Sequence, residues 1–281
     1  MKKRLTVKEN SPTCWQIPPL RATDHKYTRG SLVIFGGDAM TGAARLAARA
    51  AQRAGAGIVS IAATRASAPI YATALESVLV RACDTVQEWR HWAGDARVNA
   101  LLIGPGAGLD ERTRAALQEA ATLKKPLVLD ADALRLVAAD ASLRAALQPC
   151  PKILTPHAGE CALLAEALAL DHTTPRPALA ATLATALNAV IVLKGSETLV
   201  VDGAHGTSTH PPAWLATAGT GDVLAGAIAA LLAQGMPPLA AASAGVWLHA
   251  EAARLHGPGM IAEDVVASLP TILRGLTISR R

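Results

Sequence analysis

The sequence predicts an α/β protein in which a mostly parallel, doubly wound sheet carries helices on both faces, giving three layers. Short apolar runs alternate with helix-like segments along the chain, and this alternation is typical of strands joined by crossover helices. Glycine or polar clusters directly follow most of the apolar runs. In such sheets ligands bind beyond the carboxyl ends of the strands, so these clusters mark where a site is expected.

The first half of the chain begins with a polar, proline-containing segment over residues 1–28, which we expect to form an arm. A buried strand follows at 32–37 and ends in two glycines, and a helix is expected over 41–54 until Gly55-Ala56-Gly57 stops it. The other expected elements of this half are strands at 58–61, 98–103 and 126–129 and a helix at 110–123.

The second half continues the alternation and adds one antiparallel pair of strands, 199–201 and 206–208, which turn at Asp202-Gly203. Residues 172–178, HTTPRPA, are expected to be a loop because prolines interrupt them. With no internal repeat or low-complexity linker, residues 29–281 are expected to form one domain. Further expected elements are strands at 153–154 and 189–193 and helices at 158–170, 221–233 and 239–255.

The composition excludes several classes of protein. Hydrophobic residues make up 51% of the 281 positions and charged residues 17%, so the chain can bury a large core and is not of the disordered class. The net charge of +5 is spread along the chain and aromatic residues are 3%, whereas nucleic-acid binding favours a basic stripe with stacking aromatics. A mild positive charge would instead help to attract an anionic substrate such as a nucleotide.

Location and redox state are also constrained by the sequence. The N-terminal MKKR is followed by polar residues rather than by the apolar run of a secretory signal, and apolar runs such as 223–233 are shorter than the ~18–20 residues of a membrane helix. We therefore expect a cytoplasmic protein with no nucleic-acid or membrane partner. The four cysteines show no metal-binding spacing and are expected to be reduced: Cys14, Cys83, Cys150 and Cys161.

The most informative segment is ATAGTGDVLAG, residues 216–226, where glycines precede an apolar helix. Free backbone N–H groups around Gly219, Thr220 and Gly221, together with the helix dipole, favour the binding of a phosphate or an oxyanion. Asp222 then lies in the first helical turn, where its carboxylate can accept a proton from an attacking hydroxyl. The alternative is that Asp222 only caps the helix and the glycines form an ordinary turn.

Two further segments end predicted strands with polar residues. KGSET, residues 194–198, can contact the phosphate or adenosine part of a nucleotide, and a polar hairpin is the alternative. TPHAGE places His157 and Glu160 at another carboxyl end. His157 can be functional or structural, while Glu160 can be a first-turn acid of a helix or an outer-shell partner of magnesium.

Three other residue clusters each allow a ligand-binding and a structural interpretation. Residues 104–108, GPGAG, can wrap a substrate or form a simple turn. Asp130 and Asp132 can meet a ribose or a metal-bound water, or can cap the following helix. Gly36-Gly37 with residues 41–43 gives a loose dinucleotide-like pattern that lacks GxGxxG, so it gives little support to a Rossmann NAD site.

Taken together, these segments resemble the ADP/ATP-dependent NAD(P)H-hydrate dehydratases, the carbohydrate-kinase-like half of the two-domain hydrate repair proteins. The resemblance runs from His25 to about His256, and the order and spacing of the pieces match as well. Hydroxyethylthiazole kinases and ribokinases share a GTGD-like segment but not the TPHAGE and DADAL pieces together. The matching pieces are HKYTRGSLVIFGG, TGAARLAARAAQRAGAGIV, IGPGAG, VLDADAL, LTPHAGE, VLKGSET and ATAGTGDVLAGAIAALLAQG.

The resemblance implies a ribokinase-like fold and a hydro-lyase that restores NADH or NADPH from the (S)-hydrate while it consumes a nucleotide. Bacterial members of the family generally use ADP and release AMP and phosphate, whereas eukaryotic ones favour ATP. Mg²⁺ is the expected metal cofactor, and family members are often homotetramers. Many bacterial relatives carry an epimerase domain upstream, but about 28 residues precede the match here, so we expect no epimerase domain in this chain.

The resemblance also implies roles for individual residues. Ala43, Gly106 and His157 match residues that line the hydrated nicotinamide, and Asp222 matches the residue beside the reacting group. Met40 stands where a tyrosine or similar residue often precedes TGA, so the packing over the substrate is expected to differ. The residues that match the adenine nucleotide site are Lys194, Gly195, Ser196, Glu197, Thr198 and Gly221.

These residues suggest a phosphoryl-transfer route to dehydration. Asp222 would accept the proton of the substrate's ring hydroxyl as that oxygen attacks the terminal phosphorus of the nucleotide, while the N–H groups of residues 219–221 and Mg²⁺ stabilise the transferred group. The ring nitrogen would then expel phosphate. The main alternative is a vitamin or sugar kinase, which would leave a stable phosphoester, and an alternative of another class is a nucleotide-binding module without turnover.

Overall fold

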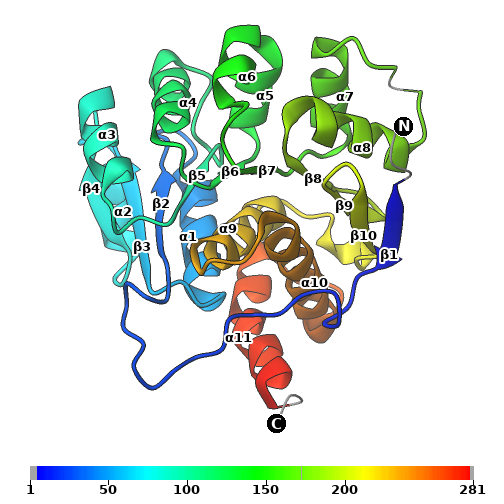
Figure 1. Ribbon diagram of the computed structural model, residues 1–281. Helices are drawn as coiled ribbons and strands as arrows, with labels where there is room; N and C mark the ends of the chain where they lie inside the picture. The colour runs from blue at the N-terminus through cyan, green and yellow to red at the C-terminus, as the bar shows by residue number, and fades with distance from the viewer. Residues whose placement is uncertain (1–4, 172, 279–281) are drawn as a thin grey trace.

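The computed structural model describes residues 5–171 and 173–278, which form a ten-stranded sheet with helices on both sides (Figure 1). The strands lie in the order β1-β10-β9-β8-β7-β6-β5-β2-β3-β4. Their bounds are β1 (Thr6–Glu9), β2 (Ser31–Phe35), β3 (Ile58–Ala63), β4 (Leu79–Ala82), β5 (Ala100–Ile103), β6 (Leu127–Leu129), β7 (Lys152–Leu154), β8 (Val190–Leu193), β9 (Thr198–Val201) and β10 (His205–Thr209).

Neighbouring strands run parallel except at the β8–β9 and β9–β10 pairs. Strands β2, β5, β6, β7 and β8 are buried along their whole length, as expected for parallel strands covered on both faces. The predicted antiparallel pair is confirmed. Its turn uses Gly203 at a φ of 103°, a conformation that favours glycine, and the Asp202 carboxylate accepts the amides of Ala204 and His205.

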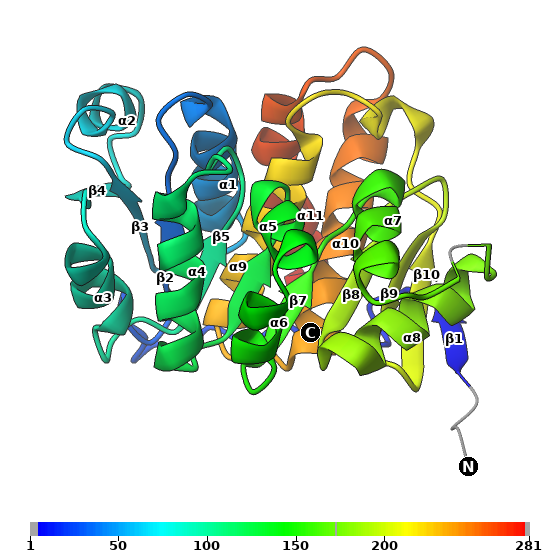
Figure 2. The same ribbon diagram turned by 90° about the horizontal axis from the view of Figure 1, so that it is seen from above.

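Helices cover both faces of the sheet, so the predicted three-layer α/β/α architecture is confirmed (Figure 2). Helices α1, α9, α10 and α11 lie on one face, and α3 to α8 lie on the other. The helix bounds are α1 (Thr41–Arg53), α2 (Ala68–Ala74), α3 (Val86–Gly94), α4 (Glu111–Leu123), α5 (Asp132–Ala139), α6 (Ala141–Leu147), α7 (Ala158–Ala167), α8 (Arg176–Leu187), α9 (Thr220–Ala233), α10 (Pro238–His256) and α11 (Ala262–Ile278).

The structure differs from the sequence prediction at several elements. The loop expected over 172–178 gives way to α8 already at Arg176, because Pro177 is well tolerated in the first turn of a helix. His172 lies outside the described residues. The helix expected over 158–170 ends at Ala167, and Ala169 takes a left-handed φ of 52°. The elements absent from the prediction are β1, α2, β4, α3, α5, α6, α8 and α11.

The N-terminal segment, expected as an arm without regular structure, adds the edge strand β1 parallel to β10. The four residues of β1 are polar on the exposed side, so no apolar pattern marks them. The buried Asn10 side chain then donates to the Ser243 carbonyl of α10 at 2.7 Å. Trp15 donates to Asn10 and packs its ring 5.6 Å from that of Trp247, so this segment is anchored on α10.

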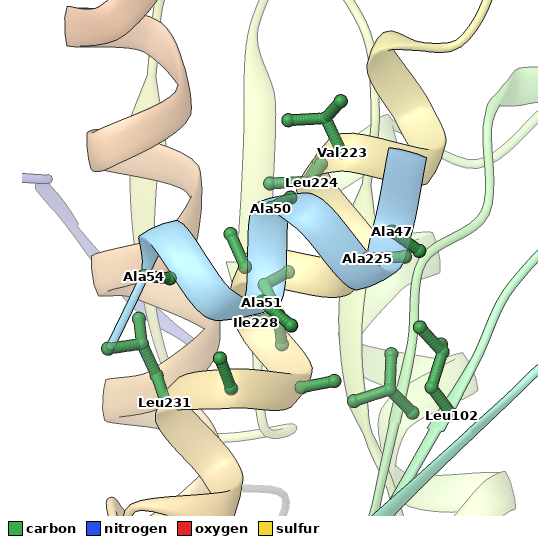
Figure 3. Packing of buried hydrophobic residues seen from close by; sticks show 14 of the residues in the cluster. Ala47, Ala50, Ala51, Ala54, Leu102, Val223, Leu224, Ala225, Ile228 and Leu231 are labelled. Carbon is green, nitrogen blue, oxygen red and sulfur yellow. The ribbon is translucent and has the colours of Figure 1, made fainter. Parts of the chain in front are cut away.

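Helices α1 and α9 pack with their backbones in contact (Figure 3). Alanines of α1 meet the apolar face of α9, and Gly226 of α9 leaves no room for a side chain, since a Cβ there would lie 2.1 Å from the Ala47 carbonyl oxygen. Glycine and alanine therefore permit an approach that larger side chains would prevent. This α1–α9 seam holds together the two helices that begin at the glycine clusters of residues 36–43 and 216–221.

Two expectations from the sequence concern membrane-spanning helices and the state of the cysteines. No helix in residues 5–171 and 173–278 is both long and apolar enough to cross a membrane. The four cysteines are free thiols, of which Cys83, Cys150 and Cys161 are buried. Burial raises the pKa of each buried thiol, that of Cys83 to about 11, so these three thiols stay protonated near neutral pH.

Candidate active site

The glycine-rich turn before α9 starts this helix without a side-chain cap. Gly219 is the N-cap residue at a φ of 88°, which favours glycine. The buried Thr220 hydroxyl donates to the Leu215 and Thr217 carbonyls at 2.8 and 2.9 Å and so fixes the turn from below. No side chain caps this helix, so the first-turn amides remain available to a ligand.

Asp222 is a half-buried carboxylate in that first turn, and none of the described residues forms a hydrogen bond with it. Burial raises its pKa to about 7, and the negative charges of Asp130 and Asp132 act in the same direction. Lys194 opposes them by lowering the pKa. A carboxylate with a pKa near neutrality is suited to accept and release a proton during turnover.

Lys194 links Asp222 to the carboxyl ends of β6 and β7. Its ammonium lies 2.9 Å from the Asp130 carboxylate and 3.9 Å from that of Glu160, and 3.6 Å from where a Cβ on Gly221 would lie. Burial favours the neutral amine, but the charges of Asp130 and Glu160, with the Asp130 hydrogen bond, together raise the pKa of Lys194. The amine is therefore held as a cation beside the glycine-rich turn before α9.

The turn after β8 is clamped by an arginine that the sequence prediction assigned to a loop. Arg176, in the first turn of α8, donates to the carbonyls of Glu197, Lys194 and Leu193 at 3.0, 3.3 and 3.4 Å. A Cβ on Gly195 would lie 2.7 Å from the guanidinium, so a larger residue there would displace this arginine. The guanidinium thereby fixes the shape of the KGSET turn.

Behind this turn lies a cavity of about 420 Å³ with mostly apolar walls. Thr198 is buried beneath the turn and exchanges hydrogen bonds with Gly195, whereas Ser196 is exposed. His249 of α10 lines the inner end and its Nε2 lies 2.9 Å from the Thr220 carbonyl oxygen. Complete burial lowers the pKa of His249 to about 4, so the ring is neutral at physiological pH and donates to that carbonyl.

Ala43 and Gly106 lie against each other, as expected if both line one substrate. A Cβ on Gly106 would lie 3.2 Å from the Ala43 Cβ and 2.4 Å from the Met40 carbonyl oxygen, and Gly106 has a φ of 62°. A Cβ on Gly37 would lie 1.7 Å from the Gly106 carbonyl oxygen. Met40 is exposed next to this point. The glycines therefore bring two strand ends into backbone contact beside the N-terminus of α1.

His157 is the N-cap residue of α7. Its Nδ1 accepts the amides of Gly159 and Glu160 at 3.0 and 3.3 Å, and the Glu160 carboxylate accepts the His157 amide at 2.8 Å. The ring therefore has a structural role at the start of α7, while 59% of its side chain is exposed. Because Nδ1 is an acceptor, the proton of the neutral ring is on Nε2, which lies 3.5 Å from Oε1 of Glu160.

Asp130 and Asp132 point in different directions because the alanine between them has an unusual backbone. Ala131 has a φ of 47° and a ψ of −119°, a region that glycine favours and alanine occupies at a cost of about 1–3 kcal/mol. The Asp130 carboxylate accepts from Lys194 and from the Thr155 hydroxyl at 2.7 Å. Asp132 accepts the Gly108 amide at 2.9 Å, which joins it to the GPGAG turn.

The strained backbone of Ala131 leads to a prediction about the free energy of unfolding. Replacing Ala131 with glycine is expected to raise the free energy of unfolding by about 0.5–1 kcal/mol, because the relieved strain exceeds the entropy lost by glycine. Ala131→Val, which is β-branched, is expected to lower it by more than 1 kcal/mol. Urea denaturation of the three proteins measures both changes. Equal losses in the two variants would show that the backbone here is unstrained.

The structure thus gathers the predicted segments at the carboxyl ends of the parallel strands. A Cβ on Gly219 would lie 2.7 Å from Leu46 of α1, which connects the glycine-rich turn before α9 with the Ala43 side of the site. Sequence reasoning missed Arg176 and His249. The first was hidden by its neighbouring prolines, and the second lies within an expected helix and carries no local signal.

A family model described as NAD(P)H-hydrate dehydratase matches residues 31–270. The chain belongs to this family of dehydratases. A relative from Neisseria meningitidis, named an ADP-dependent (S)-NAD(P)H-hydrate dehydratase, is 38% identical over 83% of this chain and 79% of its own length. A bifunctional NAD(P)H-hydrate repair enzyme of Escherichia coli is 36% identical over 92% of this chain. The chain spans about half the length of such bifunctional relatives.

Solved structures agree with the family assignment. An ADP/ATP-dependent NAD(P)H-hydrate dehydratase from Bacillus subtilis, co-crystallised with ATP and Mg²⁺, superimposes with a TM-score of 0.78 at 26% identity and covers 96% of this chain and 99% of its own. A ribokinase-like superfamily protein from Enterococcus faecalis gives the same TM-score at 24% identity over 92% of both chains. The second match shows the fold alone, and it confirms the predicted ribokinase-like architecture.

Proposed function

We propose that this chain is an ADP-dependent (S)-NAD(P)H-hydrate dehydratase, which restores NADH or NADPH from the hydrated form and releases AMP and phosphate. The observation that carries the proposal is Asp222, a carboxylate with a pKa near 7 in the uncapped first turn of α9, beside the Lys194 ammonium. The name of the Neisseria meningitidis relative supports the same reaction. The proposal covers residues 29–281 as one catalytic domain.

The proposed residue roles divide the site into a part that binds the hydrated nicotinamide and a part that binds the nucleotide. Ala43, Gly106 and His157 contact the hydrated nicotinamide, and Asp222 contacts its ring hydroxyl. Amides of Gly219, Thr220 and Gly221 hold the phosphate that is transferred. The apolar cavity behind the KGSET turn has the size and the lining of a pocket for a nucleotide base. The nucleotide is held by Lys194, Gly195, Ser196, Glu197, Thr198 and Gly221.

The proposed chemistry uses these groups in two steps. Asp222 accepts the proton of the ring hydroxyl while that oxygen attacks the terminal phosphorus of ADP, and AMP leaves. Phosphate is a better leaving group than hydroxide. The ring nitrogen's lone pair then expels phosphate, and loss of a proton from the neighbouring ring carbon restores the double bond. The first-turn amides stabilise charge on the phosphoryl group in the first step.

Mg²⁺ fits this site as part of the nucleotide substrate. Across the described ranges no cluster of three histidine, cysteine or acidic side chains could hold a metal by itself. Magnesium is commonly held by substrate phosphates and water with few protein ligands. Glu160 is engaged by the α7 cap and lies near Lys194, so an outer-shell contact through water is the role left to it. When bound, the ion supplies charge neutralisation at the phosphates.

The proposal also covers the location, the partners and the assembly state of the protein. We expect a cytoplasmic enzyme that acts on small molecules and has no nucleic-acid partner. We expect it to assemble as a homo-oligomer, a tetramer by analogy with the family. Light scattering of the purified protein measures the assembly state. A monomer at all protein concentrations would contradict the tetramer while leaving the catalytic proposal intact.

The reaction itself is tested with (S)-NADPH hydrate, Mg²⁺ and either ADP or ATP. The expected result is recovery of reduced-nicotinamide absorbance, with AMP and phosphate formed one for one in the ADP reaction. A stable phosphoester of an added vitamin or sugar, without dehydration of the hydrate, would identify a kinase instead. Nucleotide binding without any turnover would identify a binding module.

The arginine clamp gives a second prediction. Arg176→Gln is expected to raise the ADP concentration required for half-maximal rate by about 10-fold, because the KGSET turn loses charge-assisted bonds worth roughly 1–2 kcal/mol. The kcat should change much less, since the guanidinium contacts the turn rather than the reacting atoms. Arg135→Gln, which alters an exposed arginine of α5, is the control. An unchanged ADP dependence in Arg176→Gln would exclude this turn from nucleotide binding.

A further inference from the structure

Three carboxylates act on the half-buried ammonium of Lys194, namely those of Asp130, Glu160 and Asp222. The ammonium forms its hydrogen bond with Asp130 at 2.9 Å, and Asp130 is in turn fixed by the Thr155 hydroxyl at 2.7 Å. Asp222 interacts with Lys194 only through its charge and has no hydrogen-bond partner among the described residues. Asp130 therefore binds the Lys194 ammonium, which could otherwise pair with Asp222.

The charges that face Asp222 come from few elements. Helix α9 packs against α1, α10, α11, β2, β5 and β6. Strands β2 and β5 carry no charged residue, and the residues after β6 supply Asp130 and Asp132. The His249 ring of α10 is neutral and bonded to Thr220.

Other charged groups on the neighbouring helices have partners of their own. Arg254 of α10 pairs with Glu251 and donates to the His210 carbonyl. Arg45 of α1 acts on Tyr71, and Glu263 of α11 lines a groove with Arg49. Asp264 of α11 accepts the Ile261 amide. Among the described groups, Lys194 is thus the one cation that acts on the pKa of Asp222. Its ammonium also lies 3.9 Å from the Glu160 carboxylate.

We infer that Asp130 is a positioning residue of the reaction, which holds the Lys194 ammonium away from the Asp222 carboxylate and so keeps Asp222 basic enough to take the substrate's proton. The inference rests on the proposed role of Asp222 as the base. A direct Lys194–Asp222 ion pair would stabilise the ionised carboxylate, and a stabilised carboxylate is a poor proton acceptor. Asp130 needs no contact with the substrate to have this effect.

The test compares pH–rate profiles of isosteric variants. In the wild type, kcat is expected to fall as the pH drops below about 7, because Asp222 becomes protonated. Asp130→Asn should move this fall to lower pH by about one unit or more, and should lower the plateau above pH 8. Lys194→Gln should move the fall to higher pH. The double variant should return it towards the wild-type position.

Asp132→Asn is the matched control, since it removes a carboxylate two residues away that makes no bond to Lys194. It should shift the profile much less than Asp130→Asn does. A purely structural role of Asp130 would lower kcat without moving the profile, and that result would overturn the inference. So would shifts of equal size in the Asp130 and Asp132 variants.

A measurement without turnover separates this inference from the proposed reaction. Carbon-13 NMR of labelled aspartate follows the protonation of Asp222 in the free protein, with the signal assigned from its loss in Asp222→Asn. Opposite shifts of its titration in Asp130→Asn and Lys194→Gln would support the charge arrangement even if the hydrate were not dehydrated. An Asp222 titration that is the same in all variants would reject the inference whatever the enzyme's substrate.

Discussion

Asp222→Asn is expected to lower the rate of hydrate dehydration by roughly 10²–10⁴-fold, the contribution typical of a positioned general base. Asparagine has the same shape and leaves the glycine turn of α9 in place, but it cannot accept the hydroxyl proton. Steady-state rates at pH 8 with saturating ADP measure the loss. The control is Asp202→Asn in the β9–β10 turn, where the carboxylate accepts turn amides and has no proposed role in the site. A variant at position 222 with near-normal turnover would remove Asp222 from the mechanism.

The same substitution is expected to have the opposite effect on stability. The pKa of Asp222 rises from 3.8, its ordinary value, to about 7 in the folded protein, so the folded state binds the proton more tightly. Folding stability should therefore fall as the pH rises from about 4 to about 7 and level off above that. Asp222→Asn lacks this titration and should be more stable than the wild type at pH 8, by on the order of 1–3 kcal/mol. Thermal unfolding at pH 5 and pH 8 measures the difference.

Gly226→Ala is expected to destabilise the protein clearly, lowering the free energy of unfolding by about 1–3 kcal/mol. A Cβ at this position would lie 2.1 Å from the Ala47 carbonyl oxygen, which belongs to a helix backbone and cannot turn aside as a flexible side chain would. The penalty exceeds the gain in helix propensity of about 1 kcal/mol that alanine brings. Urea denaturation provides the measurement.

A second glycine supplies the control for this seam. Gly42 lies in the first turn of α1, and no atom lies within 4 Å of where its Cβ would be. Gly42→Ala should therefore leave the stability unchanged or raise it by up to about 1 kcal/mol. Equal effects of the two substitutions would mean that α1 and α9 are free to move apart, contrary to the close packing described.

Much of the fold was predictable because parallel strands covered on both faces must be short apolar runs. The runs at 32–37, 98–103 and 189–193 are of that kind, and each forms a strand. Elements with mixed patterns were missed. Strand β1 is a polar edge strand, and β4 is half-exposed, so neither shows a continuous apolar run. Helix α8 was hidden by prolines that a first turn tolerates.

The site was predictable as a set of strand ends but not as a set of contacts. Sheet order places β6, β7 and β8 side by side, so Asp130, His157 and Lys194 had to meet at one edge. Which carboxylate would take the Lys194 ammonium depends on a distance of about an ångström and on the unusual backbone of Ala131. Packing across the sheet determines which groups pair in this way, and no local sequence pattern predicts it.

The pairing of β1 with β10 has a consequence for synthesis on the ribosome. Residues 205–208, the partners of residues 6–9, are synthesised about 200 residues after them, and Ser243, the partner of Asn10, later still. Strand β1 therefore remains without its native neighbours while most of the sheet can already assemble, since contacts so distant in sequence form late. This edge strand should thus join the sheet only after α10 has been made.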